Sequence, residues 1–139
     1  MTADNTIHEA SNDGRSAINR RTLLIVETNP AVMLDYLNFL SGSGCDANAH
    51  ITLRYVPDKL TLTPASFSDY LAALADFSTE PLERLAIAIL EDINNELVPR
   101  WVQITAVRDN DIEPGHRVLI EDRQPKWDNP ALLARLERF

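Results

Sequence analysis

Two amphipathic stripes that follow each other directly are the strongest constraint in this sequence. Between residues 80 and 97, apolar side chains recur every three or four positions, as on one face of an α-helix. They are Leu82, Leu85, Ala86, Ile89, Leu90, Ile93 and Leu97. Residues 64–77 repeat this spacing, with Thr63 as the expected N-cap and Pro64 in the first helical position. The sequence therefore predicts two adjacent helices whose apolar faces another layer must cover.

Strand patterns lie on both sides of these helices. Residues 50–57 alternate between apolar and polar side chains, and so do residues 100–107. Residues 116–122 supply a further strand, which we expect to form a hairpin with 100–107 around a turn at Pro114. Residues 21–28 are rich in aliphatic and β-favouring residues, which predicts a first strand buried on both faces.

Two shorter segments remain. Residues 30–40 predict a helix that is capped by Asn29, has Pro30 in its first position and ends at the sequence SGSG, residues 41–44. The same stretch also fits an irregular strand. Residues 130–139 carry apolar side chains at helical spacing, which is typical of a short amphipathic helix.

The expected architecture follows from this order of elements. Residues 1–20 are polar without a sustained period and predict a mobile arm. Residues 21–139 predict a single α+β domain: an antiparallel ββααββ sheet with two adjacent helices on one face, plus the short C-terminal helix. The other face of the sheet would be wet in an isolated domain, which predicts a homo-oligomer.

Composition excludes several classes of protein. A net charge of −8 repels phosphate backbones and argues against direct nucleic-acid binding. No apolar run approaches the roughly 18 residues of a spanning helix, and the first twenty residues lack the apolar centre of a signal peptide. We therefore expect a soluble cytoplasmic protein without membrane contact. Cys45 is the single cysteine, which excludes an internal disulfide and a multi-cysteine zinc site, so no metal is expected.

Only a few residues are candidates for chemistry. Cys45 stands next to Asp46, so that it is either a nucleophile beside a carboxylate or an incidental thiol in a glycine-flanked loop. His50 and His116 each begin an expected strand, and each is either an acid or base near neutral pH or a surface histidine.

Charged residues offer two further possibilities. Glu80 and Glu83 fall in the first turn of the second helix, where the helix dipole favours negative charge. A carboxylate held there can also accept paired N–H bonds from a purine or pterin ring. Arg117 belongs to a small basic cluster with Arg123 and Lys126, which fits either a bound phosphate or a solvated surface.

Three stretches carry a resemblance to a known family. They read RYVPDKL at 54–60, SFSDYL at 66–71 and ERLAIAILEDINNELVPRWVQI at 83–104. Over about fifty residues the chain resembles the NADPH-dependent 7-cyano-7-deazaguanine reductases of queuosine biosynthesis, which belong to the tunnelling-fold superfamily together with GTP cyclohydrolase I. The resemblance implies ββααββ units that join edge to edge into barrel rings, with substrate sites between subunits.

The resemblance also assigns site residues. The family's substrate-anchoring glutamate falls on Glu83, although Leu82 stands where the family has a histidine. The family's nucleophilic cysteine and proton-donating aspartate fall on Leu40 and Ala47, so Cys45 and Asp46 are the nearest catalytic candidates.

The cofactor motif of the family is depleted in this chain. The signature E-S-K-S-x-K-x-Y lies on TPASFSDY at 63–70, which keeps Ser66 and Tyr70 but lacks the glutamate and both lysines. The family also has an Arg-Gly-Gly element near the end of the chain, which is reduced here to PGHR at 114–117. Arg117 in this stretch is the candidate for cofactor binding. Lysines would attract an anionic nicotinamide cofactor, so their absence removes an electrostatic anchor.

The sequence thus favours a divergent member of the family that binds a purine- or pterin-like base near Glu83, with Ser66 as a second substrate contact, at a subunit interface. Normal nitrile reduction is not expected, and no cofactor is expected with it. One alternative is an active reductase that uses NADPH and a rearranged Cys45 loop. Another is a non-catalytic structural subunit.

Overall fold

A computed structural model describes residues 19–43, 49–110 and 114–138 of the chain. The strands, in chain order, are β1 (Val26–Thr28), β2 (Asn38–Ser43), β3 (Ala49–Val56), β4 (Leu60–Leu62), β5 (Trp101–Arg108) and β6 (His116–Arg123). The helices are α2 (Pro64–Ala72), the 3₁₀ turn η1 (Ala75–Phe77), α3 (Leu82–Leu97), α4 (Pro130–Leu133) and the 3₁₀ helix η2 (Ala134–Arg138).

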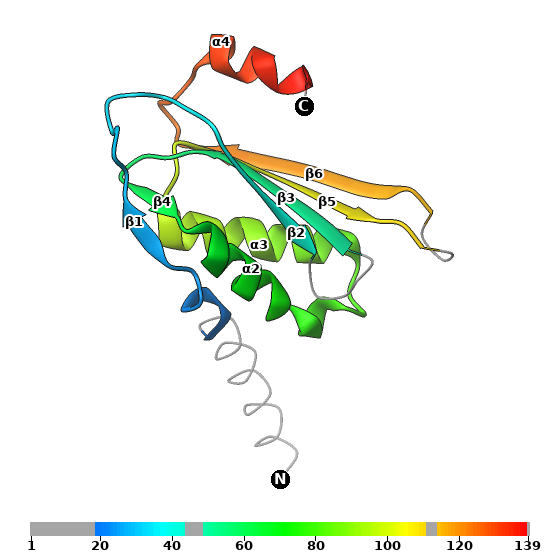
Figure 1. The fold of residues 1–139 in the computed structure, drawn as a ribbon. Coiled ribbons are helices and arrows are strands. Elements are labelled where there is room, and N and C mark those ends of the chain that lie inside the picture. The colour runs from blue at the N-terminus through cyan, green and yellow to red at the C-terminus, as the bar shows by residue number, and fades with distance from the viewer. Residues whose placement is uncertain (1–18, 44–48, 111–113, 139) are drawn as a thin grey trace, which may run out of the picture.

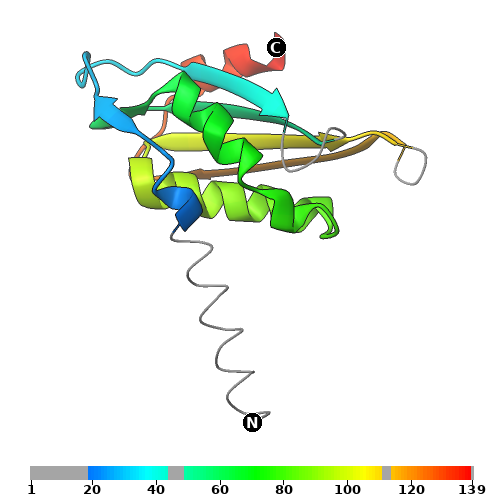
Figure 2. The same ribbon diagram turned by 60° about the horizontal axis from the view of Figure 1, so that its bottom comes forward.

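The main sheet has four antiparallel strands in the order β2-β3-β5-β6, and β1 pairs with β4 in a separate two-stranded ribbon. Helices α2 and α3 lie together on one face of the main sheet, and α4 lies on the other side (Figures 1 and 2). The α+β class, the antiparallel pairing and the β5-β6 hairpin are confirmed. Strands β2 and β6 are the outer strands of this sheet among the described residues.

The core lies between the main sheet and the two helices. Leu53 and Ile104 share one row of the sheet and are fully buried under the helices. From the other side, Leu85, Ile89 and Ile93 of α3 are also fully buried, as the stripe predicts. Each such side chain contributes about 1.5–3 kcal/mol by leaving water. This packing therefore determines the position of α3 on the sheet, and it also determines which residues of α3 lie on its outer face.

The two main helices begin and end close to the predicted positions, with one difference. Helix α2 stops at Ala72, because the N–H groups of Ala73 and Leu74 bond to carbonyls three residues back, and only η1 follows. The prediction of one helix over 64–77 was therefore too long. Thr63 is the N-cap residue, but its hydroxyl lies 2.7 Å from the Ser66 hydroxyl and makes no bond to a backbone N–H.

The predicted helix over 30–40 is wrong. Residues 30–37 form a turn and a loop, and β2 begins at Asn38, so the SGSG stretch continues a strand rather than ending a helix. Arg100 explains the loop, because its guanidinium donates to the backbone oxygens of Val32 and Leu34 and so replaces helical partners. The alternative of a strand is correct only for the last three residues of the segment, 38–40, which begin β2.

The first strand is shorter and more exposed than predicted. Only Val26–Thr28 is extended, whereas Arg21 lies in a short helical turn. Leu24 is buried, but Ile25 is 59% exposed. Among the strands that the structure describes, it pairs with the short β4 alone, so it has no buried position in the main sheet. The expected mobile arm lies outside the described residues, except for Asn19 and Arg20.

The C-terminal segment packs against the loop that precedes β2. Trp127 and Asn129 both donate to a carboxylate oxygen of Asp35, each at 3.1 Å. The predicted C-terminal helix is present as α4 followed by η2. Within the part of the chain that the structure describes, no helix is long and apolar enough to cross a membrane.

Candidate functional site

Glu83 lies on the outward side of the first turn of α3. Because Leu82 and Leu85 face the core, Glu83 projects away from it, and Ile87 lies one turn further along the same outer side. The Glu83 side chain is 59% exposed, and Ile87 is 47% exposed. Together with Pro81 and Arg84 they line an open hollow of about 390 Å³. A carboxylate and an apolar side chain thus share one small concave surface.

Two features of the structure lie next to the Glu83 carboxylate. The positive end of the α3 dipole lies at this turn. The His116 Nε2 atom, at the start of β6, lies 3.2 Å from Glu83 Oε1. Because more than half of the Glu83 side chain is exposed, the group can accept paired N–H bonds from a planar ligand that enters the hollow.

Ser66 is not a neighbour of Glu83 within one chain. It is only 2% exposed, and its hydroxyl accepts from the Ile25 N–H at 3.0 Å and donates to the Thr63 carbonyl at 2.9 Å. It therefore ties the first turn of α2 to the segment before β1. Helix α2 begins beside the β1-β4 ribbon, whereas α3 begins at the opposite end of the helical layer (Figure 1).

Arg117 is also separated from Glu83. It is exposed on β6, directly after His116. Since side chains alternate between the two faces along a strand, Arg117 lies on the face opposite to the helices and to Glu83. Cys45 and Asp46 fall in residues 44–48, outside the described residues. Within one chain, the structure therefore brings neither Ser66 nor Arg117 to Glu83.

A buried polar network in the helical layer was missed by sequence reasoning. Asp92 of α3 is 3% exposed and accepts hydrogen bonds from the Tyr70 hydroxyl at 2.5 Å and from Arg20 Nε at 2.6 Å. Burial and the neighbouring Asp92 carboxylate raise the pKa of Tyr70, so its phenol stays neutral and donates. A carboxylate between Ile89 and Ile93, within an apolar stripe, is the sequence signal that would have indicated this network.

Tyr55 occupies a second buried position, at the edge of a larger hollow. Its hydroxyl accepts from the Leu62 N–H at 2.9 Å and from the Asn38 amide at 3.2 Å, and it thereby joins β3 to β4 and β2. Burial raises the pKa of this phenol as well. The hollow beside it, between the ribbon and β2, measures about 520 Å³. The hydrogen bonds that join β3 to β4 and β2 therefore explain why a tyrosine stands at position 55 in the RYVPDKL stretch.

No group of three or more metal-ligating side chains gathers anywhere in residues 19–43, 49–110 and 114–138. Comparison with known proteins adds no identification: no protein-family model matches the chain, and no curated protein matches it significantly.

Proposed function

We propose that this chain is a divergent tunnelling-fold protein, related to the 7-cyano-7-deazaguanine reductases, that binds a purine- or pterin-like base at Glu83 without normal nitrile reduction. The observation that carries the proposal is the exposed Glu83 carboxylate beside Ile87 and the hollow on the outer side of α3. The main sheet takes β2 and β3 from before the two helices and β5 and β6 from after them, with both helices on one face (Figure 1), and this arrangement supports the assignment.

A carboxylate is suited to this ligand class because guanine-like and pterin-like rings present two adjacent N–H donors on one edge. Two parallel N–H···O bonds to a carboxylate provide strength and orientation together. Ile87 offers an apolar surface for the ring, and His116 can supply a further polar contact.

The hollow on a single chain is open and is lined only by residues in or just before the first turns of α3, so the proposed site is completed by a second copy. The outer edges of β2 and β6 support this association, because both strands have a backbone edge that no other described strand pairs. Edge-to-edge pairing of copies would extend the sheet and bring residues of a neighbouring chain toward Glu83. The proposed partner is therefore the protein itself.

The proposal is tested by thermal unfolding of the full chain with purines, pterins and 7-deazaguanines, alongside light scattering. We expect an assembly larger than a monomer, and a rise in Tm with at least one base that is lost in Glu83→Ala. A stable assembly that responds to no base would instead support a purely structural subunit.

The active-reductase alternative is separated by a different assay. Consumption of NADPH with 7-cyano-7-deazaguanine, abolished by Cys45→Ala, would support a rearranged cysteine loop and contradict our proposal. We expect no turnover, because Thr63, Ala65 and Ser68 stand where the family signature has its charged residues.

A further inference from the structure

The two outer strands of the main sheet differ in charge. Strand β2 reads NFLSGS and contains no charged residue and no proline, whereas β6 carries four charged residues among its eight. Natural sheets usually protect an open edge with charged side chains, proline or a bulge, because an unprotected edge pairs with other chains. Strand β2 pairs with β3 without interruption over Asn38–Ser43, so it has no bulge either. Among the strands that the structure describes, the outer edge of β2 is therefore both unpaired and unprotected.

The helices packed against these strands show the same difference. Helix α2 contacts β2, whereas α3 contacts β5 and β6 and carries five charged residues. A Cβ atom on Gly42 would lie 3.1 Å from a Leu71 methyl group, so α2 packs closely against β2. Asp69 is the single charged residue of α2. The other exposed side chains of this helix are small or prolyl: Pro64, Ala65, Ser68 and Ala72. The outer edge of β2 and the exposed positions of α2, here called the β2-α2 surface, thus carry one charge in a chain of net charge −8.

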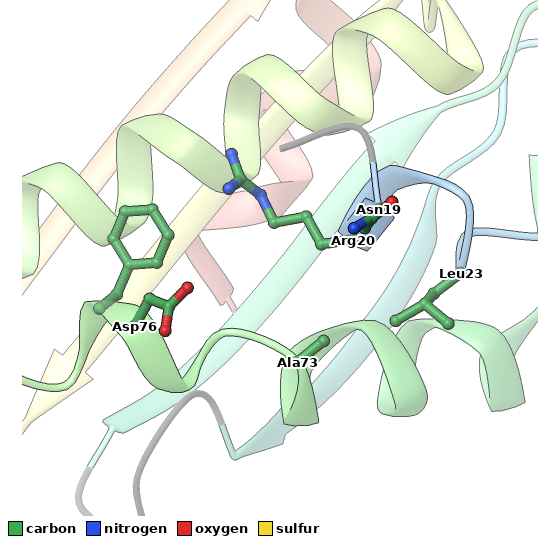
Figure 3. A pocket seen from close by; sticks show the side chains of 6 residues that line it. Asn19, Arg20, Leu23, Ala73 and Asp76 are labelled. Atoms are coloured by element: carbon green, nitrogen blue, oxygen red, sulfur yellow. The ribbon is translucent and has the colours of Figure 1, made fainter. Parts of the chain in front are cut away.

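The N-terminal turn brings a further charge to the helical layer, but it directs this charge to α3. Arg20 reaches from the turn toward α3 (Figure 3), and its Nε atom lies 2.6 Å from Asp92 Oδ2. Asp76 lines the hollow beside Arg20 and lies on η1, after α2 has ended. These charges are paired within the chain or lie beyond the end of α2, so Asp69 remains the one charge of the β2-α2 surface.

We propose that the β2-α2 surface binds a second copy of this chain across a two-fold axis, with the β2 strands of the two copies paired antiparallel. In a two-fold contact each surface meets its own copy, so like charges face each other, and a surface with one charge largely avoids this repulsion. Pairing with β6 of another copy would instead place charged side chains beside an uncharged strand. The contact rests on the proposed self-association but not on base binding, because β6 and the Glu83 hollow lie at the opposite edge of the sheet.

The residues of β2 fit this pairing when Ser41 lies on the two-fold axis. Residues directly opposite each other in an antiparallel pair share one face of the sheet. Leu40 then lies opposite Gly42 of the second copy. Phe39, which is 43% exposed, lies opposite Ser43 of the second copy. On each face of the joined sheet, a large side chain therefore meets a small one.

A charge placed on the axis tests this geometry. Ser41→Glu puts two carboxylates opposite each other, and we expect the mass of the assembly in sedimentation equilibrium to halve. Thr105→Glu is the matched control, because it adds the same charge to the same row and face of the sheet away from both edges, and it should keep the parent mass. An equimolar mixture of Ser41→Glu and Ser41→Lys chains should regain the parent mass, because opposite charges then meet on the axis.

Cross-linking decides the case if Ser41→Glu does not fold, which its thermal unfolding would show. In a Cys45→Ser background, mild oxidation should join two Ser41→Cys chains by a disulfide, since opposite residues of an antiparallel pair lie within its reach. Leu119→Cys, at an exposed position of the same row on β6, should not cross-link. A monomeric parent, an unchanged mass of folded Ser41→Glu, no recovery in the mixture, or equal cross-linking of the two cysteine variants would overturn the proposal. Base binding is decided separately by Glu83→Ala, so either proposal can fail without the other.

Discussion

The contact between Arg20 and Asp92 gives the most stringent stability prediction. In Arg20→Met the side chain keeps much of its apolar length but loses its charge, and Asp92 remains buried with Tyr70 as a donor. Removing one partner of a buried ion pair costs about 3–5 kcal/mol. Because the Arg20 side chain is 16% exposed, water can replace part of its effect, and we expect the low end, about 3 kcal/mol.

Urea unfolding followed by circular dichroism measures this cost. With an m-value of about 2 kcal/mol/M for a chain of this size, the unfolding midpoint should fall by about 1.5 M urea. The matched control is Arg21→Met, the neighbouring arginine, whose 3.8 Å contact to Glu96 is more exposed and should contribute less than about 1 kcal/mol. Similar losses in Arg20→Met and Arg21→Met would refute the reasoning.

Three further predictions concern the helical layer. Ile89→Ala should lower the free energy of unfolding by about 2–5 kcal/mol, whereas Ile87→Ala, which changes an exposed position of the same helix, should change it by less than about 1 kcal/mol in urea unfolding. A Cβ atom on Gly42 would lie 3.1 Å from a Leu71 methyl group, so Gly42→Val should destabilise the chain by about 1–3 kcal/mol in the same assay. Because the pKa of Tyr70 is raised on folding, its contribution to stability is present below the ordinary phenol pKa of about 10 and is lost as pH rises beyond it. The loss of Tm between about pH 9 and pH 11 should therefore be smaller in Tyr70→Phe than in the parent, and an equal loss would contradict the assignment.

Long, regular patterns predicted the helical layer well. The stripe of α3 specified both its length and its buried face, because seven apolar positions at one spacing leave little choice of orientation. The alternation of 50–57 likewise placed Ile51, Leu53 and Tyr55 in the core.

The errors occurred where distant partners decide the local structure. The loop before β2 has helix-like spacing, but Arg100 satisfies its backbone oxygens and β3 pairs with the residues that follow. The site was less predictable than the fold for the same reason. Glu83 was predicted from the family resemblance together with its place in the first turn of α3, and it stays a prediction, whereas Arg20, Asp92 and Tyr70 meet only after the chain has folded.

The central claim is that the Glu83 carboxylate anchors a planar base. Isothermal titration of the most stabilising base into the parent, Glu83→Gln and Glu91→Gln measures it directly. Glu91→Gln removes the same charge from an exposed position of the same helix and controls for net charge. A charge-assisted hydrogen bond contributes about 1.5–3 kcal/mol, so Glu83→Gln should weaken binding about tenfold to a hundredfold, and Glu91→Gln should leave it unchanged. Equal affinities of the parent and Glu83→Gln for the base would contradict the account.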